Sequence, residues 1–177
     1  YFCLKGVGLI RIDPALTRLE VIGGDAVIRD VNIHNTCIIR DGGQPYFALP
    51  SDEAQKVFIT DKKGKLIRTL PNPYGEGGGA FRVCDVEVVG GILFAANGYA
   101  DNVCFAADPF FGKPEQPDVG SWFPLRFGGR GTAHGKFGTA HGIIQFIRLD
   151  QRQPITGSLL IERGDQSIGS HRITIGT

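Results

Sequence analysis

The segment RVCDVEVVGGILFA, residues 82–95, contains two short runs rich in β-branched and other apolar residues, joined by Gly90-Gly91. Two glycines between such runs are typical of a tight β-hairpin, because glycine readily adopts the positive φ angles that these turns need. A helix is disfavoured, since the apolar residues alternate or run continuously and show no helical period. The segment therefore predicts two antiparallel strands.

The start of this hairpin recurs along the chain. Asn32-Ile33-His34-Asn35-Thr36, Arg82-Val83-Cys84-Asp85-Val86 and Thr139-Ala140-His141-Gly142-Ile143 align with one another, and a short hydrophobic run, a turn and further strand-like runs follow each. A repeat of roughly fifty residues with four strands per unit is typical of β-propeller blades. A β-sandwich also has short strands and frequent turns, but the repeat disfavours it.

We therefore expect an all-β fold, an incomplete propeller of about three and a half four-stranded blades. Residues 1–24 form a partial blade, 25–75 and 76–130 form blades, and 131–177 form a blade that lacks its outer strand. The expected strands are 8–13 and 18–24, then 37–39, 46–49, 56–60 and 66–70, then 86–89, 92–95, 102–105 and 122–126, and finally 143–146, 158–161 and 171–175.

Composition and charge exclude several classes of function. The formal net charge is +1, so the balance of charges offers no basis for binding nucleic acid or an anionic membrane. No apolar stretch is long enough to span a bilayer. The glycine clusters lack the Lys-Ser/Thr pair of a phosphate loop, and there is no GxSxG motif of a serine hydrolase. The four cysteines contain no CxxC pair, and their simplest interpretation is as free thiols in strands.

Two segments resemble a known family. The first is Phe127-Gly128-Gly129-Arg130-Gly131 with the following Gly135–Ile143, which is similar to the junction between NHL repeats. The second is Asp85–Val88 followed by Ala96–Asn102, which resembles the catalytic domain of peptidyl-α-hydroxyglycine α-amidating lyase. The resemblance to these NHL-type six-bladed β-propellers, and to related bacterial propellers, extends over nearly the whole chain and is clearest from Asp25 to Ile143.

The resemblance implies a particular site. In the lyase, three histidines from alternate blades hold a zinc ion on the central axis, and a tyrosine lies near the substrate. His34 and His141 match two of these histidines and Tyr99 matches the tyrosine, while the third histidine would lie beyond residue 177. An extracellular or periplasmic location is favoured.

The repeat itself places three side chains at equivalent positions. We expect His34, Cys84 and His141 to face the central channel, where two imidazoles and a thiolate could ligate Zn²⁺ and leave a position open for water. Tyr99 is then a candidate catalytic acid or base.

Asp85 and Asn35 could hold the inner histidines by hydrogen bonds. In the alternative interpretation the histidines bond to backbone carbonyls, Cys84 fills a small inner position and Tyr99 is a turn aromatic. His134 and His171 fall outside the repeated position, and we expect them to be exposed.

Two functions remain open at this point. The chain could be a binding or assembly scaffold whose loops and central channel recognise a protein, peptide or glycan, with the ring completed by other chain segments or by self-association. It could alternatively be a metal-dependent lyase or hydrolase that uses His34, His141 and Tyr99. The sequence leaves open whether the protein is an enzyme.

Overall fold

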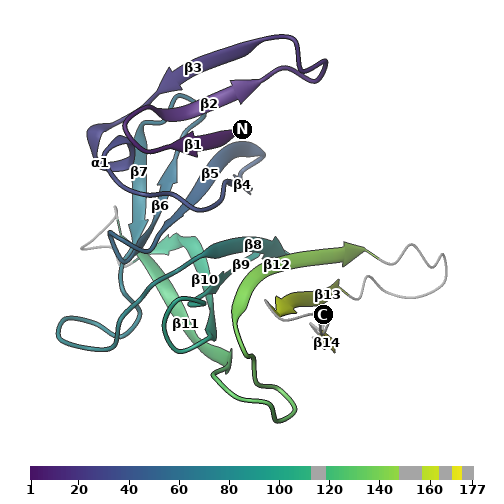
Figure 1. Ribbon diagram of the computed structural model, residues 1–177. Coiled ribbons are helices and arrows are strands. Elements are labelled where there is room, and N and C mark those ends of the chain that lie inside the picture. The colour runs from purple at the N-terminus through teal and green to yellow at the C-terminus, as the bar shows by residue number, and fades with distance from the viewer. Residues whose placement is uncertain (113–118, 148–156, 164–168, 173–177) are drawn as a thin grey trace.

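The computed structural model describes residues 1–112, 119–147, 157–163 and 169–172. Within them the fold is all-β, as expected, and four antiparallel sheets of three or four strands follow one another along the chain. The sheets fan out in chain order and leave an opening between the first and the last (Figure 1), so the described part is propeller-like without forming a closed ring. No helix in this part is long and apolar enough to cross a membrane.

The first sheet has one strand more than expected. Its strands, in spatial order, are β1 (Phe2–Leu4), β2 (Gly8–Ile12) and β3 (Leu19–Gly23). The expectation of two strands here was wrong, because three residues are too few to show an alternating pattern. The connection to the second sheet contains a second unexpected element, the one-turn helix α1 (Ala26–Arg29), which buries Ile28.

The second and third sheets are complete four-stranded units with their strands in chain order. The strands are β4 (Cys37–Asp41), β5 (Gln44–Ser51), β6 (Lys56–Thr60), β7 (Leu66–Leu70), β8 (Asp85–Val89), β9 (Ile92–Ala96), β10 (Val103–Gly112) and β11 (Gly120–Gly128). The expected end of β10 at residue 105 was too early. Proline is rare inside strands, so Asp108-Pro109 suggests that a strand ends there. The pairing of β10 with β11 nevertheless continues past Pro109 through two register shifts.

The turn glycines act as predicted. Gly42 and Gly43 have φ angles of 53° and 81°, and Gly90 and Gly91 have φ angles of 59° and 83°. Two successive positive φ angles define the hairpin turn whose twist matches that of the flanking strands. The turns pair Asp41 with Gln44 across β4 and β5, and they establish the register of each sheet at its first hairpin.

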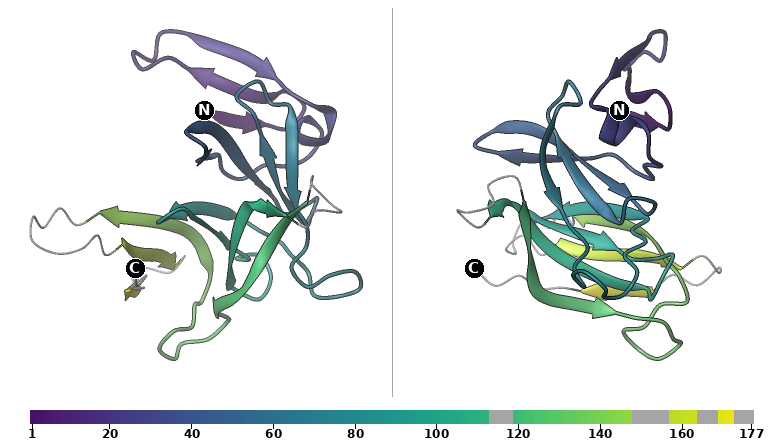
Figure 2. Two further views of the ribbon diagram at one scale, coloured as in Figure 1. Left: turned by 180° about the vertical axis from the view of Figure 1, so that it is seen from behind. Right: turned by 90° about the vertical axis from the view of Figure 1, so that its left-hand side faces the viewer.

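The last sheet has three strands in the described residues, β12 (Ala140–Ile147), β13 (Gly157–Arg163) and β14 (Gly169–Arg172). Strands were expected here at 143–146, 158–161 and 171–175, and each overlaps one of the observed strands. The end of the last expected strand lies outside the described residues. Figure 2 shows this sheet beside the third one, with β12 next to β8.

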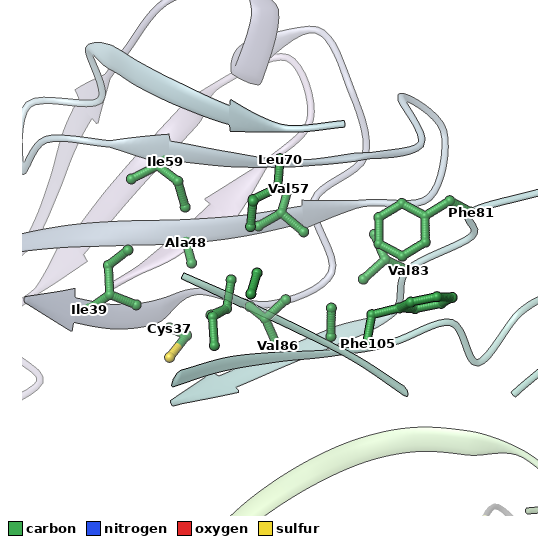
Figure 3. Close-up of a cluster of buried hydrophobic side chains, with 13 residues drawn as sticks. Cys37, Ile39, Ala48, Val57, Ile59, Leu70, Phe81, Val83, Val86 and Phe105 are labelled. Carbon is green, nitrogen blue, oxygen red and sulfur yellow. The ribbon is translucent and has the colours of Figure 1, made fainter. Parts of the chain in front are cut away.

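Apolar side chains fill the spaces between successive sheets. Three separate clusters of buried residues lie between the first and second, second and third, and third and fourth sheets. Figure 3 shows the middle cluster, in which Val57 and Ile59 from β6 face Val86 from β8 and Phe105 from β10. Burying each such side chain is worth about 1.5–3 kcal/mol, so face-to-face packing of sheets provides most of the cohesion.

Part of the outer face of the first sheet has no such partner in the described residues, although Ile10 on the same face is 3% exposed. Ile12 pairs with Leu19 and Ile10 pairs with Val21, which places all four side chains on one face. Ile12, Leu19 and Val21 are 39%, 57% and 59% exposed. The opposite face of this sheet packs on the second sheet through Leu9.

A buried carboxylate links three of the sheets. Asp85, at the start of β8, is 8% exposed and accepts hydrogen bonds from the Asn35 amide before β4 and, at 2.6 Å, from the Ile143 N–H in β12. The same Asn35 amide lies 3.2 Å from the Val86 carbonyl oxygen. Burial raises the pKa of the Asp85 carboxyl, although these donors oppose the change. We call this arrangement the Asp85 link.

Replacing Asp85 with alanine tests the Asp85 link. The substitution leaves the Ile143 N–H without its acceptor and leaves the Asn35 amide only the Val86 carbonyl oxygen, and we expect the free energy of unfolding to fall by about 2–4 kcal/mol in urea denaturation. The control is Asp30→Ala, because the Asp30 side chain is 69% exposed. We expect the control to change the free energy by less than about 0.5 kcal/mol. Equal effects of the two substitutions would contradict a linking role.

Candidate functional site

The backbone at the repeated position is equivalent in two sheets. The His34 N–H donates to the Pro50 carbonyl oxygen in β5 at 3.1 Å, and the Cys84 N–H donates to the Ala96 carbonyl oxygen in β9 at 3.0 Å. In both cases a residue shortly before the first strand of a sheet donates its backbone N–H to a carbonyl oxygen in the second strand of the same sheet. The alignment of the repeats therefore corresponds to a structural equivalence.

Three aromatic side chains from three successive sheets meet next to this position. The Tyr99 ring lies between the rings of His34 and His141, with centroid distances of 5.1 Å and 4.8 Å respectively. Tyr99 is 42% exposed and His141 is also exposed, while the His34 side chain is 20% exposed. We call these three residues the aromatic row. The structure thus brings together both predicted histidines and the predicted tyrosine.

The position of Tyr99 depends on the glycine before it. A Cβ atom on Gly98 would lie 2.1 Å from the Ala140 carbonyl oxygen and 2.5 Å from the Cys84 Sγ atom. No real side chain fits at these distances, so only glycine lets the loop approach β12 closely enough for Tyr99 to contact His141.

A buried asparagine fixes the same loop. The Asn97 side chain accepts a hydrogen bond from the Arg82 N–H at 2.6 Å and donates to the Ala80 carbonyl oxygen at 3.0 Å and to Asp101 at 2.8 Å. Asn97 is fully buried, so all of these bonds lie away from solvent. The loop therefore presents Tyr99 on a rigid support.

Asp52 is a component of the site that the sequence analysis did not identify. Its carboxylate accepts hydrogen bonds from the Nε2 atom of His34 and the Nη2 atom of Arg82, both at 2.8 Å, and its side chain is 10% exposed. Burial opposes the charge, but the two donors outweigh it and hold the pKa of Asp52 below its usual value. The carboxylate can only accept, so the His34 proton lies on Nε2.

No pattern in the sequence pointed to Asp52. It lies in the short connection that follows β5, the strand to which the His34 backbone bonds. The alternative interpretation, in which His34 bonds to a backbone carbonyl, does not describe this contact. The guanidinium of Arg82 extends from the same carboxylate with 54% of its side chain exposed, and it adds a cation beside the aromatic row.

Cys84 takes part in the contact between the third and fourth sheets. It is 6% exposed, and its thiol donates to the Ala140 carbonyl oxygen at 3.1 Å and lies 3.5 Å from the Ala96 carbonyl oxygen. Burial raises the pKa of Cys84 to about 11, so the thiol is protonated at neutral pH. As a metal ligand Cys84 would first have to lose this proton.

The remaining predicted residues have different surroundings. Asn35 and Asp85 bond to each other and to Val86 and Ile143, and so belong to the Asp85 link. His134 is exposed, and His171 lies in β14, whose side chains are not among those described. Within the described residues, no group of three or more His, Cys, Asp or Glu side chains is arranged to hold a metal ion.

Comparison with known proteins adds no assignment, since no family model and no curated protein matches this sequence. The geometry therefore carries the functional argument. It comprises an exposed tyrosine between two histidines, a buried carboxylate that orients one of the histidines, and an arginine on the same carboxylate.

Alkylation of the free thiols tests the environment of Cys84. In the native protein at about pH 8 we expect iodoacetamide to leave Cys84 and Cys104 unmodified, because these residues are 6% and 0% exposed and the reagent cannot reach their thiols. Half-buried Cys3 reacts earlier, and all four thiols react in urea. Peptide mass spectrometry measures each site. Modification of Cys84 as fast as Cys3 in native protein would show that its thiol is not enclosed.

Proposed function

We propose that this chain is part of an NHL-type β-propeller that acts as a binding and assembly scaffold, with the aromatic row and Arg82 as its recognition surface. The observation that carries the proposal is the exposed Tyr99 ring between His34 and His141. Its ligand is an extended segment of a protein, peptide or glycan.

The chemistry of the surface suits recognition. Tyrosine and arginine dominate the energetics of binding surfaces, because each combines a large contact area with hydrogen-bonding groups. Desolvation raises the pKa of Tyr99, so its phenol remains a hydrogen-bond donor at neutral pH. The supports from Gly98 and Asn97 hold the ring before any ligand arrives, which reduces the entropy lost on binding.

The open face of the first sheet supports the assembly part of the proposal. Ile12, Leu19 and Val21 form an exposed apolar surface on a sheet whose other face packs against a neighbouring sheet. A further blade, from another chain segment or from a second copy, would cover this surface in the way that successive sheets already cover each other.

Selection of ligands tests the recognition surface. We expect peptides or glycans selected from arrays on the wild-type protein to bind Tyr99→Ala at least about tenfold more weakly, because the ring at the centre of the surface is lost. Tyr1→Ala is the matched control, since Tyr1 is 47% exposed and lies just before β1, outside the aromatic row. Fluorescence polarisation gives the dissociation constants. Unchanged binding to Tyr99→Ala would exclude the aromatic row as the surface.

A second candidate is a metal-dependent lyase or hydrolase, in which His34 and His141, now on either side of Tyr99, would have to move together to share a metal ion. The hydrogen bond from His34 Nε2 to Asp52 would orient the imidazole and leave Nδ1 available as a ligand. Zinc would supply a Lewis acid at this place, Cys84 could contribute a third ligand after losing its proton, and the protonated phenol of Tyr99 would act as general acid.

Zinc binding tests this second candidate. The second candidate requires isothermal titration to give one tight zinc site in the wild-type protein, with affinity reduced at least about tenfold in His141→Ala. His134→Ala should behave like the wild type, because His134 is not part of the aromatic row. Elemental analysis of protein purified without chelator provides a second reading. Absence of zinc uptake, or equal uptake by His141→Ala, would exclude the metal site.

A further inference from the structure

The first sheet has one strand fewer than the second and third sheets in the described residues. In those two sheets the first strand, β4 or β8, lies at one edge, and the last strand, β7 or β11, lies at the other edge and leads to the next sheet. β3 leads to β4 in the same way, so β1 corresponds to a second strand, β5 or β9. No described strand lies at the position of a first strand, on the other side of β1 from β2.

The backbone of β1 can accept another strand at this edge. Successive residues of an antiparallel strand direct their N–H and C=O groups alternately to one side and to the other. The Leu4 carbonyl oxygen accepts from the Val7 N–H on the side of β2, so the backbone groups of Cys3 point away from β2. Cys3 is the last but one residue of β1, as Pro50 is of β5. An added strand would therefore bond to Cys3 as His34 bonds to Pro50.

One face of β4 has an apolar side chain that the first sheet does not cover. Ile38 pairs with Phe47, which belongs to the cluster between the first and second sheets, so Ile38 lies on the face toward the first sheet. Ile38 is nevertheless 50% exposed. On the corresponding face of β8, Val86 is fully buried in a cluster that contains Cys37 and Ile39 of β4 (Figure 3). A first strand thus covers this face in the next sheet.

Arg40 determines the charge that suits the uncovered face. It follows Ile38 by two residues and so lies on the same face, where it is exposed. No ion pair within the described residues involves Arg40. A carboxylate opposite Arg40 would be attracted, whereas a second cation would be repelled. β4 itself has a suitable pattern on its other face, since Cys37, Ile39 and Asp41 place two apolar residues before an acid.

We propose that the edge of β1 and the uncovered face of β4 bind one extended strand of a partner polypeptide, with apolar residues at alternate positions followed by an acidic residue. Hydrogen bonds to the β1 backbone hold such a strand, and its contacts with Ile38 and Arg40 give specificity. A second copy offers no spare strand among its described residues, because each of these strands already pairs within its own sheet. The site goes beyond the proposed function, since it includes neither the aromatic row nor the outer face that contains Val21.

A synthetic peptide with the sequence of residues 36–42 and the change Cys37→Val carries the required pattern and tests the proposal. We expect the fluorescently labelled peptide to bind the full chain saturably in anisotropy measurements, and hydrogen exchange of the Cys3 amide to become slower. Ile38→Glu in the chain should weaken binding at least about tenfold, because it places a charge under the apolar residues of the peptide. Val21→Glu is the matched control, since Val21 is 59% exposed on the outer face of the first sheet, and it should bind like the wild type.

Charge reversal gives an independent reading of the same site. Arg40→Glu should weaken binding of the peptide at least about threefold, because it removes the ion pair and adds a like charge. A peptide that also carries Asp41→Lys should bind the Arg40→Glu chain as tightly as the first peptide binds the wild type. The same peptide should bind the wild-type chain more weakly.

Several results would overturn the proposal. They are the absence of saturable binding to the wild-type chain, equal binding of a peptide whose apolar residues are shifted by one position, and unchanged affinity in Ile38→Glu. A dimer of the chain alone that Ile38→Glu abolishes would assign the edge to a second copy instead. None of these results depends on Tyr99, so the test of the aromatic row would stand.

Discussion

The hydrogen bonds to the buried carboxylate of Asp85 determine how three sheets lie against one another. Apolar packing between sheets is strong but non-directional, so it holds the sheets together without defining how far one is displaced along the next. The bonds from Asn35 and Ile143 are directional, and they join the entries of β4, β8 and β12 at one end of the sheets. Because the aromatic row is assembled at these entries, its geometry depends on the same carboxylate.

Several buried or mostly buried residues hold the side chains of the site in place. Asp52 holds His34 and Arg82, while Asn97 and Gly98 bring Tyr99 against the last sheet. Tyr99 and His141 are exposed, so recognition depends on a few accessible side chains that their buried neighbours hold in place.

Much of the fold could be predicted from local pattern. The bounds of β6 and β7 agree with the apolar runs 56–60 and 66–70, and paired glycines marked the hairpin turns correctly. β1 and α1 were missed because three or four residues carry too little periodicity, and β10 extends past Pro109 because tertiary pairing overrides a local break signal.

The sequence by itself predicted the repeat and the hairpins, and it placed His34 and His141 at equivalent positions of repeated units. Tyr99 was identified only through the family resemblance of the segment that contains it. Only the tertiary structure decided the hydrogen-bond partners. Asp52 is 18 residues from His34, and Ile143 is 58 residues from Asp85. It also decided that the Cys84 thiol bonds to a carbonyl of the next sheet. Such partners depend on how separate sheets pack, which no local pattern encodes.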